Sequence, residues 1–210
     1  MMKYFNKFKW IPLLSFVCFL SFTSLSFAQI TYQGNYSLRY PVYKFMEPEP
    51  NTIKTNDGKI TAELTEHVFS LYINKKIAQI IPLENFNSGQ ALISAFHDDK
   101  ANRNFYSVTI INFGAKMPNP TYLFTSYPKS PSSELLTLID TKDYYNPFSQ
   151  DSAPSSSYFA ITPDNPNVLI LEHVKNNYKM QYRYALTWHE KDFKFTYEDL
   201  GYMHEDRNDY

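Results

Sequence analysis

The chain has 210 residues, of which 43% are hydrophobic and 20% charged, and its formal net charge is −1. This length favours one domain or two small ones, and the hydrophobic content is sufficient for a core and excludes a disordered chain. Glycine is scarce at 5 residues, whereas aromatic residues make up 18% of the chain. Aromatic side chains pack well on a pleated sheet, so the composition favours β-structure and argues against glycine-rich nucleotide-binding folds.

Residues 1–28 differ from the rest of the chain. Three lysines precede an uncharged apolar stretch from Trp10 to about Leu25, and Ser26-Phe27-Ala28 then supplies small residues. This order is typical of a secretory signal peptide and predicts cleavage after Ala28. A retained membrane anchor is the alternative, because ~18 apolar residues can just span a bilayer. The small residues before position 29 favour cleavage. Cys18 lacks the small neighbours of a lipidation site, so we expect no stable membrane anchor after cleavage.

Cleavage removes three lysines and the only cysteine, and it leaves 17 basic and 21 acidic residues, a net charge of −4. The mature chain then has no disulfide, no thiolate nucleophile and no cysteine-ligated metal. It also lacks the clustered Lys and Arg that bind phosphates, which argues against a nucleic-acid partner. An exported chain without disulfides fits a bacterial periplasm, with the cell surface or the extracellular medium as alternatives.

Apolar and polar residues alternate along most of the mature chain, the pattern of strands with one solvated face. We expect strands at 30–40 and 60–64. Pairs of such segments joined by polar turns predict two hairpins. The first joins 68–73 to 77–81, and the second joins 91–97 to 105–113.

Further short strands are predicted in the second half of the chain, at 122–126, 135–139 and 158–162. The last 45 residues then predict a three-stranded meander. Residues 168–174 are more continuously apolar than the other segments, as expected for a strand covered on both faces. Residues 178–189 pair through a polar turn with 193–198.

About ten short strands predict an all-β fold, a single antiparallel β-sandwich or a strongly curved sheet. We expect this domain to span 29–202, followed by a polar tail at 203–210. The terminal hairpin, from Tyr182-Arg183-Tyr184 to Leu200-Gly201-Tyr202, resembles the closing hairpin of uncharacterised exported bacterial all-β proteins. This chain departs from that pattern by a longer last strand. The resemblance implies an exported β-domain and no particular activity.

Motifs for catalysis or metal binding are absent from the sequence. It contains no Gly-x-Ser-x-Gly elbow, and its five histidines, at 67, 97, 173, 189 and 204, never occur as His-x-His or at the His-Glu-x-x-His spacing. Residues 98–102 carry oxygen ligands but lack the central Gly and distal Glu of a calcium loop, so we interpret them as a turn. No metal or cofactor is expected.

Paired carboxylates for glycoside cleavage are harder to exclude, because their separation depends on the fold. Several acids lie on or near predicted strands: Glu63, Glu66, Glu172, Glu190 and Glu198. Glu172 interrupts an apolar strand and either lines a cavity or is an edge-strand charge that discourages aggregation. We favour the edge-strand interpretation.

The segment 140–157 offers the best indication of a binding site. Aromatic residues are unusual in a long loop, and tyrosine supplies rigid contact area with a polar tip. The candidate binding residues are Tyr144, Tyr145, Phe148, Asp140, Asp143 and Asp151. The alternative is that Tyr145 and Phe148 fold back as a lid over an open end of the sandwich. A second loop, 116–120, is expected alongside.

The leading hypothesis is a periplasmic, non-enzymatic binding protein, most concretely an inhibitor or immunity protein that neutralises an envelope-acting toxin or hydrolase. Such targets are often basic, so the negative charge would assist encounter. The three aromatic residues would pack on the partner protein, and the three aspartates would meet its basic rim. One alternative is an envelope glycan or peptidoglycan hydrolase, which needs two carboxyls within ~10 Å in one groove. Another is a surface or adhesion subunit, which needs an open sheet edge.

Overall fold

The computed structural model describes residues 29–41, 52–113, 119–126, 134–149, 155–162, 165–175 and 180–203. The predicted signal peptide, Asp151, residues 116–118 and all of the predicted tail except Met203 lie outside these residues. Within them the chain forms thirteen strands and one short 3-10 helix. All strand pairs within the sheets are antiparallel, which confirms the predicted all-β fold.

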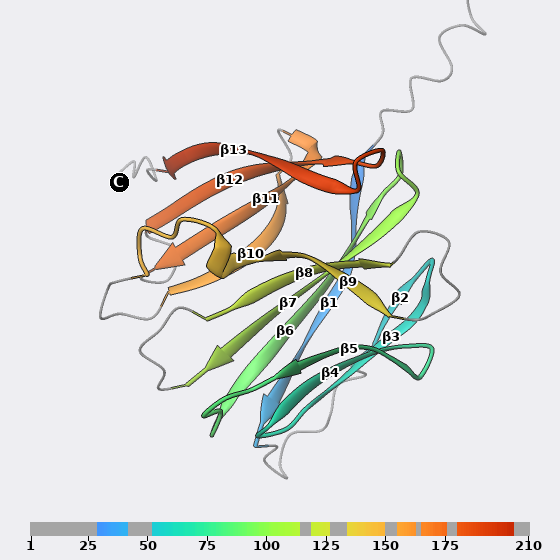
Figure 1. Ribbon diagram of the computed structural model, residues 1–210, viewed down its shortest axis with the longest axis vertical. Helices are drawn as coiled ribbons and strands as arrows, with labels where there is room; N and C mark the ends of the chain where they lie inside the picture. The colour runs from blue at the N-terminus through green and yellow to red at the C-terminus, as the bar shows by residue number, and fades with distance from the viewer. Residues whose placement is uncertain are drawn as a thin grey trace, which may run out of the picture.

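The strands form three sheets (Figure 1). The central sheet has the order β1 (Ile30–Tyr40), β6 (Gly89–Asp98), β7 (Arg103–Asn112), β8 (Thr121–Ser126) and β9 (Leu135–Asp140). The N-terminal sheet contains β2 (Ile53–Thr55), β3 (Gly58–Leu64), β4 (Val68–Ile73) and β5 (Lys76–Pro82). The C-terminal sheet contains β10 (Ser155–Thr162), β11 (Asn165–Lys175), β12 (Met180–His189) and β13 (Lys194–Met203).

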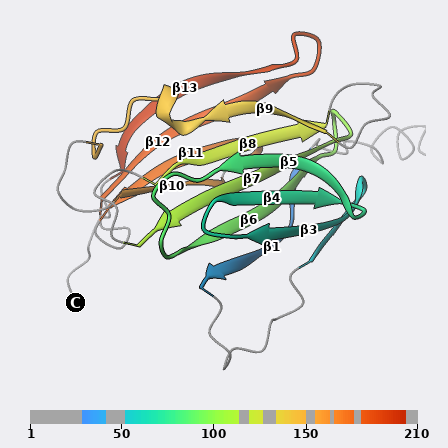
Figure 2. The same ribbon diagram turned by 60° about the horizontal axis from the view of Figure 1, so that its bottom comes forward.

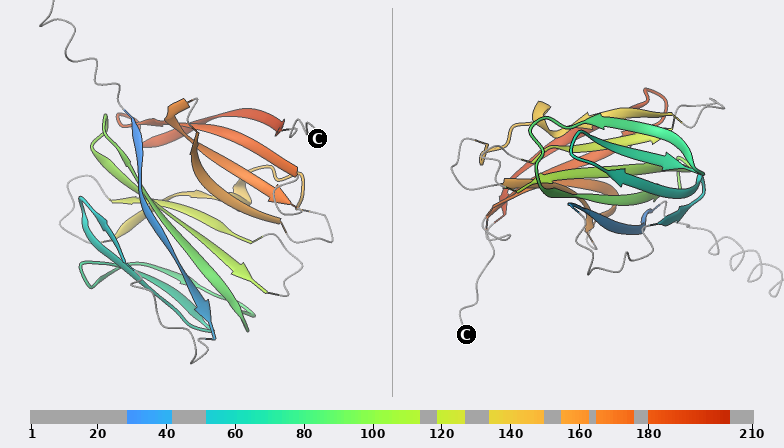
Figure 3. Two further views of the ribbon diagram at one scale, coloured as in Figure 1. Left: turned by 180° about the vertical axis from the view of Figure 1, so that it is seen from behind. Right: turned by 90° about the horizontal axis from the view of Figure 1, so that it is seen from below.

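The central sheet lies between the other two, as Figures 2 and 3 show. Alternate residues of a strand point to opposite faces, so one strand supplies side chains to two cores. Ile93 and Val108 pack against the N-terminal sheet, whereas Phe96 and Phe105 pack against the C-terminal sheet. The central sheet is therefore the part of the molecule that both hydrophobic cores share.

The predicted hairpins are present. In the β4–β5 hairpin the two turn residues, Asn74 and Lys75, have φ angles of 50° and 67°. Positive φ at both central residues is the backbone of the two-residue turn that matches the twist of paired strands. The terminal meander is also present as β11, β12 and β13.

Residues 155–157, predicted as part of a loop, are instead the first residues of β10. Their backbone groups have partners on the central sheet. The N–H of Asn119 donates to the carbonyl of Ser155 over 3.2 Å, and the hydroxyl of Thr121 donates to the carbonyl of Ser157 over 2.7 Å. These hydrogen bonds give partners to backbone carbonyl groups on the free edge of β10. They therefore hold the serine-rich segment in strand conformation.

A polar and aromatic contact joins the far end of the C-terminal sheet to the central sheet. The guanidinium of Arg103, next to the β6–β7 turn, forms two hydrogen bonds with the carboxylate of Glu190, at 2.8 and 2.6 Å. It also lies 4.6 Å from the ring centroid of Phe193.

None of the helices in the described ranges is long and apolar enough to cross a membrane.

Candidate functional site

The first half of the predicted binding loop is organised by Asp140. Its carboxylate accepts a hydrogen bond from the backbone N–H of Lys142 and caps the helix η1 (Thr141–Asp143). The ammonium of Lys142 lies 2.7 Å from the same carboxylate, and this contact raises the pKa of Lys142. Asp140 therefore holds the loop in shape, which leaves the exposed Asp143 as the freer charge of the two.

The second half of the loop folds back onto the C-terminal sheet. Phe148 is only 2% exposed and packs in the core between the central and C-terminal sheets, so the prediction that it contacts a partner is wrong. Burying an apolar ring at the open end of a core stabilises the folded protein, because it removes apolar area from water. The lid interpretation holds for Phe148 but not for Tyr145, whose side chain is 67% exposed.

The loop and the last two strands enclose a cavity of about 440 Å³, which we call the tyrosine groove. It is lined by Leu138, Ile139, Asp140, Asp143, Tyr144, Tyr145, Tyr184, Tyr197 and Asp199. The structure thus brings together four of the six predicted site residues. Asp151 lies outside the described residues, and Phe148 does not line the groove.

Tyrosine rings form the walls of this groove through edge-to-face contacts. Tyr144 lies 5.7 Å from Tyr184 and 5.4 Å from Tyr197, measured between ring centroids, and Tyr145 lies 5.8 Å from Tyr182. The hydroxyl of Tyr184 donates to the backbone carbonyl of Tyr145 over 2.8 Å. Edge-to-face packing of this kind stabilises the rings beyond simple burial and fixes their directions.

Hydrogen bonding and burial keep these phenols protonated. The hydroxyl of Tyr182 donates to the carboxylate of Asp199 over 2.7 Å, and this bond raises the pKa of Tyr182 to about 12. Burial also raises the pKa values of Tyr144 and Tyr184. At neutral pH the groove therefore carries neutral hydroxyl groups on its walls, with the carboxylates as its negative charges.

Sequence reasoning missed Tyr184, Tyr197 and Asp199 as members of this site. Alternation along the terminal hairpin does place Tyr184 and Tyr197 on one face. Asp199 pairs with Tyr184 in the register that runs from the hairpin turn, and the pairing shifts only beyond it, between Tyr184 and Arg183. That the loop after β9 packs onto this face depends on long-range contacts, and no local pattern shows it.

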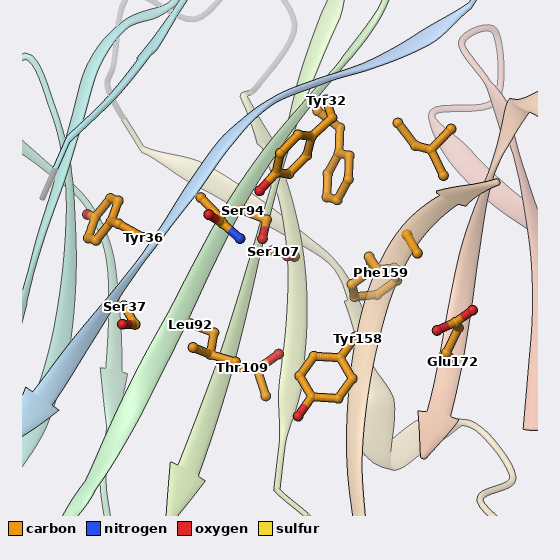
Figure 4. A pocket seen from close by; sticks show the side chains of 14 residues that line it. Tyr32, Tyr36, Ser37, Leu92, Ser94, Ser107, Thr109, Tyr158, Phe159 and Glu172 are labelled. Carbon is orange, nitrogen blue, oxygen red and sulfur yellow. The ribbon is translucent and has the colours of Figure 1, made fainter. Parts of the chain in front are cut away.

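A second cavity, of about 810 Å³, lies between the central and C-terminal sheets, and we call it the inter-sheet cavity (Figure 4). Glu172 lines it, is 9% exposed and lies 2.7 Å from the guanidinium of Arg183. The interpretation of Glu172 as an edge-strand charge is wrong, because β11 lies between β10 and β12. Among the described residues lining this cavity, Glu172 is the only acid.

A serine and a histidine meet inside the core. The hydroxyl of Ser157 lies 2.7 Å from Nδ1 of His173, and the residues are 1% and 0% exposed. Burial lowers the pKa of His173 to about 4. Since neither side chain reaches solvent, this pair cannot meet a substrate and is a structural contact.

The segment 98–102, which carries possible oxygen ligands for calcium, forms a turn in the structure. The carboxylate of Asp98 accepts hydrogen bonds from the backbone N–H groups of Lys100 and Ala101, each at 2.9 Å, which is how aspartate stabilises a turn. In the part of the chain that the structure describes, no group of three or more His, Cys, Asp or Glu side chains is placed to hold a metal ion.

The chain matches no protein-family model, no curated protein and no solved structure. The resemblance of the terminal hairpin to exported bacterial proteins therefore stays a prediction.

Proposed function

We propose that this chain is an exported, non-enzymatic binding protein that engages a basic protein through the tyrosine groove. Its most concrete form is an inhibitor or immunity protein that neutralises an envelope-acting toxin or hydrolase in the periplasm. The observation that carries this proposal is the groove itself, where exposed tyrosines and carboxylates from the loop and from β13 lie side by side.

Exposed aromatic side chains support a role in recognition. Tyr145 is 67% exposed, Tyr197 is 63% exposed and Tyr202 is 51% exposed. Each exposed ring leaves apolar area in water, and several rings together form the kind of surface that marks an interaction site. Tyrosine is also among the residues that contribute most to binding free energy at protein interfaces.

The charge of the groove favours a cationic partner. Asp140, Asp143 and Asp199 line it, and Lys142 neutralises only the first of these. A lysine or arginine of the partner would meet both carboxylates and tyrosine faces there, which attract cations. The net charge of −4 expected for the mature chain would add long-range attraction to a basic surface.

A hydrolase is the second candidate, because the same three carboxylates converge on one groove, as glycoside cleavage would require. Two of them already serve the fold, however. Asp140 caps η1 and pairs with Lys142, and Asp199 accepts from the hydroxyl of Tyr182 and the N–H of Gly201. These carboxylate oxygens are already engaged by groups of the protein itself, whereas a catalytic carboxyl must reach the substrate. Binding is therefore the better-supported function.

The proposal is tested by replacing Tyr145 and Tyr197 together with alanine. Both rings are largely exposed, so the double variant should fold, and its affinity for a partner captured from envelope extract should fall at least ~30-fold, the effect of losing an interface hot spot. The measurement is a titration of the captured partner by surface plasmon resonance. The control is Thr137→Ala, an exposed side chain on β9. Unchanged affinity in the double variant would remove the groove from the interface.

The hydrolase candidate makes a different prediction. If the carboxylates were catalytic, Asp143→Asn and Asp199→Asn would abolish turnover of a labelled peptidoglycan or glycan substrate. We expect the unaltered protein to release no soluble fragments from such substrates. Release that depends on these carboxylates would replace the binding proposal with the enzymatic one.

A further inference from the structure

The inter-sheet cavity is walled by edge strands of two sheets. β1, together with β6 and β7, forms one wall, and four consecutive residues of β10, Tyr158 to Ile161, form the other (Figure 4). Its volume of about 810 Å³ falls within the ~300–1,000 Å³ of small-molecule sites. The cavity lies along β10, the edge strand of the C-terminal sheet opposite β13, and it shares no lining residue with the tyrosine groove.

Hydroxyl groups dominate the polar part of its lining. They belong to Tyr32, Tyr36, Ser37, Ser94, Ser107, Thr109 and Tyr158, of which the hydroxyl of Thr109 already donates to the carbonyl of Ser157. In Figure 4 most of them lie on the wall of β1, β6 and β7, and Tyr158 faces them from β10, next to Phe159. Each hydroxyl can both donate and accept a hydrogen bond. Such a lining matches a ligand that itself carries many hydroxyl groups.

The charge of the cavity is close to neutral. Its one acid, Glu172, is neutralised by Arg183 at 2.7 Å, and no lysine, arginine or histidine is among the described residues that line it. A phosphate or carboxylate ligand would have no cation to pair with, and a cationic ligand would compete with Arg183. A wholly apolar ligand would form no hydrogen bond with the serine hydroxyls of the lining.

We propose that the inter-sheet cavity binds a neutral saccharide, with the hydroxyls of Ser94 and Ser107 and the carboxylate of Glu172 bonding to sugar hydroxyls. A sugar ring also has an apolar face, which the aromatic ring of Phe159 can cover. Glu172 is suited to this role because a charged acceptor forms hydrogen bonds about twice as strong as a neutral one.

The test is titration of the protein, purified after expression of the full chain, with chitotriose and with maltotriose by isothermal calorimetry. Glucose 6-phosphate and spermidine serve as anionic and cationic comparison ligands. We expect saturable binding of at least one neutral trisaccharide and none of the charged ligands. Absence of binding of both trisaccharides at millimolar concentration, or binding of a charged ligand alone, would overturn the proposal.

Two variants locate the binding. Ser37→Trp places an indole at the exposed rim of the cavity and should abolish trisaccharide binding, whereas Thr137→Trp, on the other edge strand of the same sheet, should leave it unchanged. Glu172→Gln keeps an acceptor for Arg183 and should weaken binding about tenfold. Thermal unfolding verifies that each variant is folded. Undiminished affinity in Ser37→Trp and Glu172→Gln would place the saccharide elsewhere and overturn the assignment.

Discussion

Replacing Arg103 with alanine is expected to lower the free energy of unfolding by about 2 kcal/mol, because the guanidinium is buried although its partner Glu190 is 47% exposed, and hydrogen bonds to charged groups contribute about 1.5–3 kcal/mol. The side chain of Arg103 is 10% exposed, and its guanidinium makes two hydrogen bonds to Glu190 and one to the carbonyl of Ser126. Alanine would leave that carboxylate and that carbonyl without these donors. It would also remove the cation from the rings of Trp188 and Phe193.

The measurement is urea unfolding at neutral pH followed by circular dichroism. Lys142→Ala is the matched control, because Lys142 also pairs with one carboxylate but is 74% exposed. Exposed pairs of this kind contribute ~0–1 kcal/mol. Arg103→Lys should recover only part of the loss, since lysine cannot make the two-pronged contact. A loss below ~1 kcal/mol for Arg103→Ala would show that this contact does not hold the two sheets together.

Acidification is expected to destabilise the protein through His173. Burial lowers its pKa from 6.5 to about 4, so between these values the unfolded chain binds a proton that the folded protein excludes. The stability due to the neutral imidazole is therefore fully present above pH 6.5 and is lost progressively as the pH falls toward 4. With 1.36 kcal/mol for each unit of pKa, the loss amounts to about 3 kcal/mol.

Unfolding free energies measured from pH 7.5 to 4 in urea would reveal this loss. His173→Leu removes the titrating group, so its stability should vary about 3 kcal/mol less over this range than that of the unaltered protein, whatever its absolute stability. His67→Leu is the control, because the side chain of His67 is 83% exposed. Glu190 contributes little to the pH dependence in this range. The hydrogen bond from Arg103 lowers its pKa, so the stability due to its charged carboxylate is lost only as the pH falls below 4.5. Equal pH dependence in all three proteins would contradict the assignment to His173.

The strands could be predicted because alternation is a local property. In β12, Tyr182, Tyr184 and Leu186 are buried while Thr187 is exposed, as period-two reasoning expects. β2, from Ile53 to Thr55, was missed because three residues are too few to show alternation. The start of β10 was missed because a serine-rich segment has no apolar face, and its strand conformation depends on hydrogen bonds from Asn119 and Thr121.

The site could be predicted only in part, because its composition is a local property whereas its geometry depends on contacts between distant segments. Aromatic residues in a loop identified Tyr144 and Tyr145, but composition does not separate the exposed Tyr145 from the buried Phe148. That distinction depends on which side of the loop faces the C-terminal sheet. The order of strands in a sheet cannot be read from the sequence. Glu172 was therefore assigned to a sheet edge, although its strand, β11, lies between β10 and β12.

We propose that the tyrosine groove faces a basic protein partner. Site-specific photo-crosslinking in cells tests it most directly, with a benzophenone amino acid placed at position 145, at position 197 or, as a control, at position 137. We expect a crosslinked product containing one basic exported protein from positions 145 and 197 and none from position 137. Crosslinking from position 137 with none from the groove, or no protein product from any position, would contradict it.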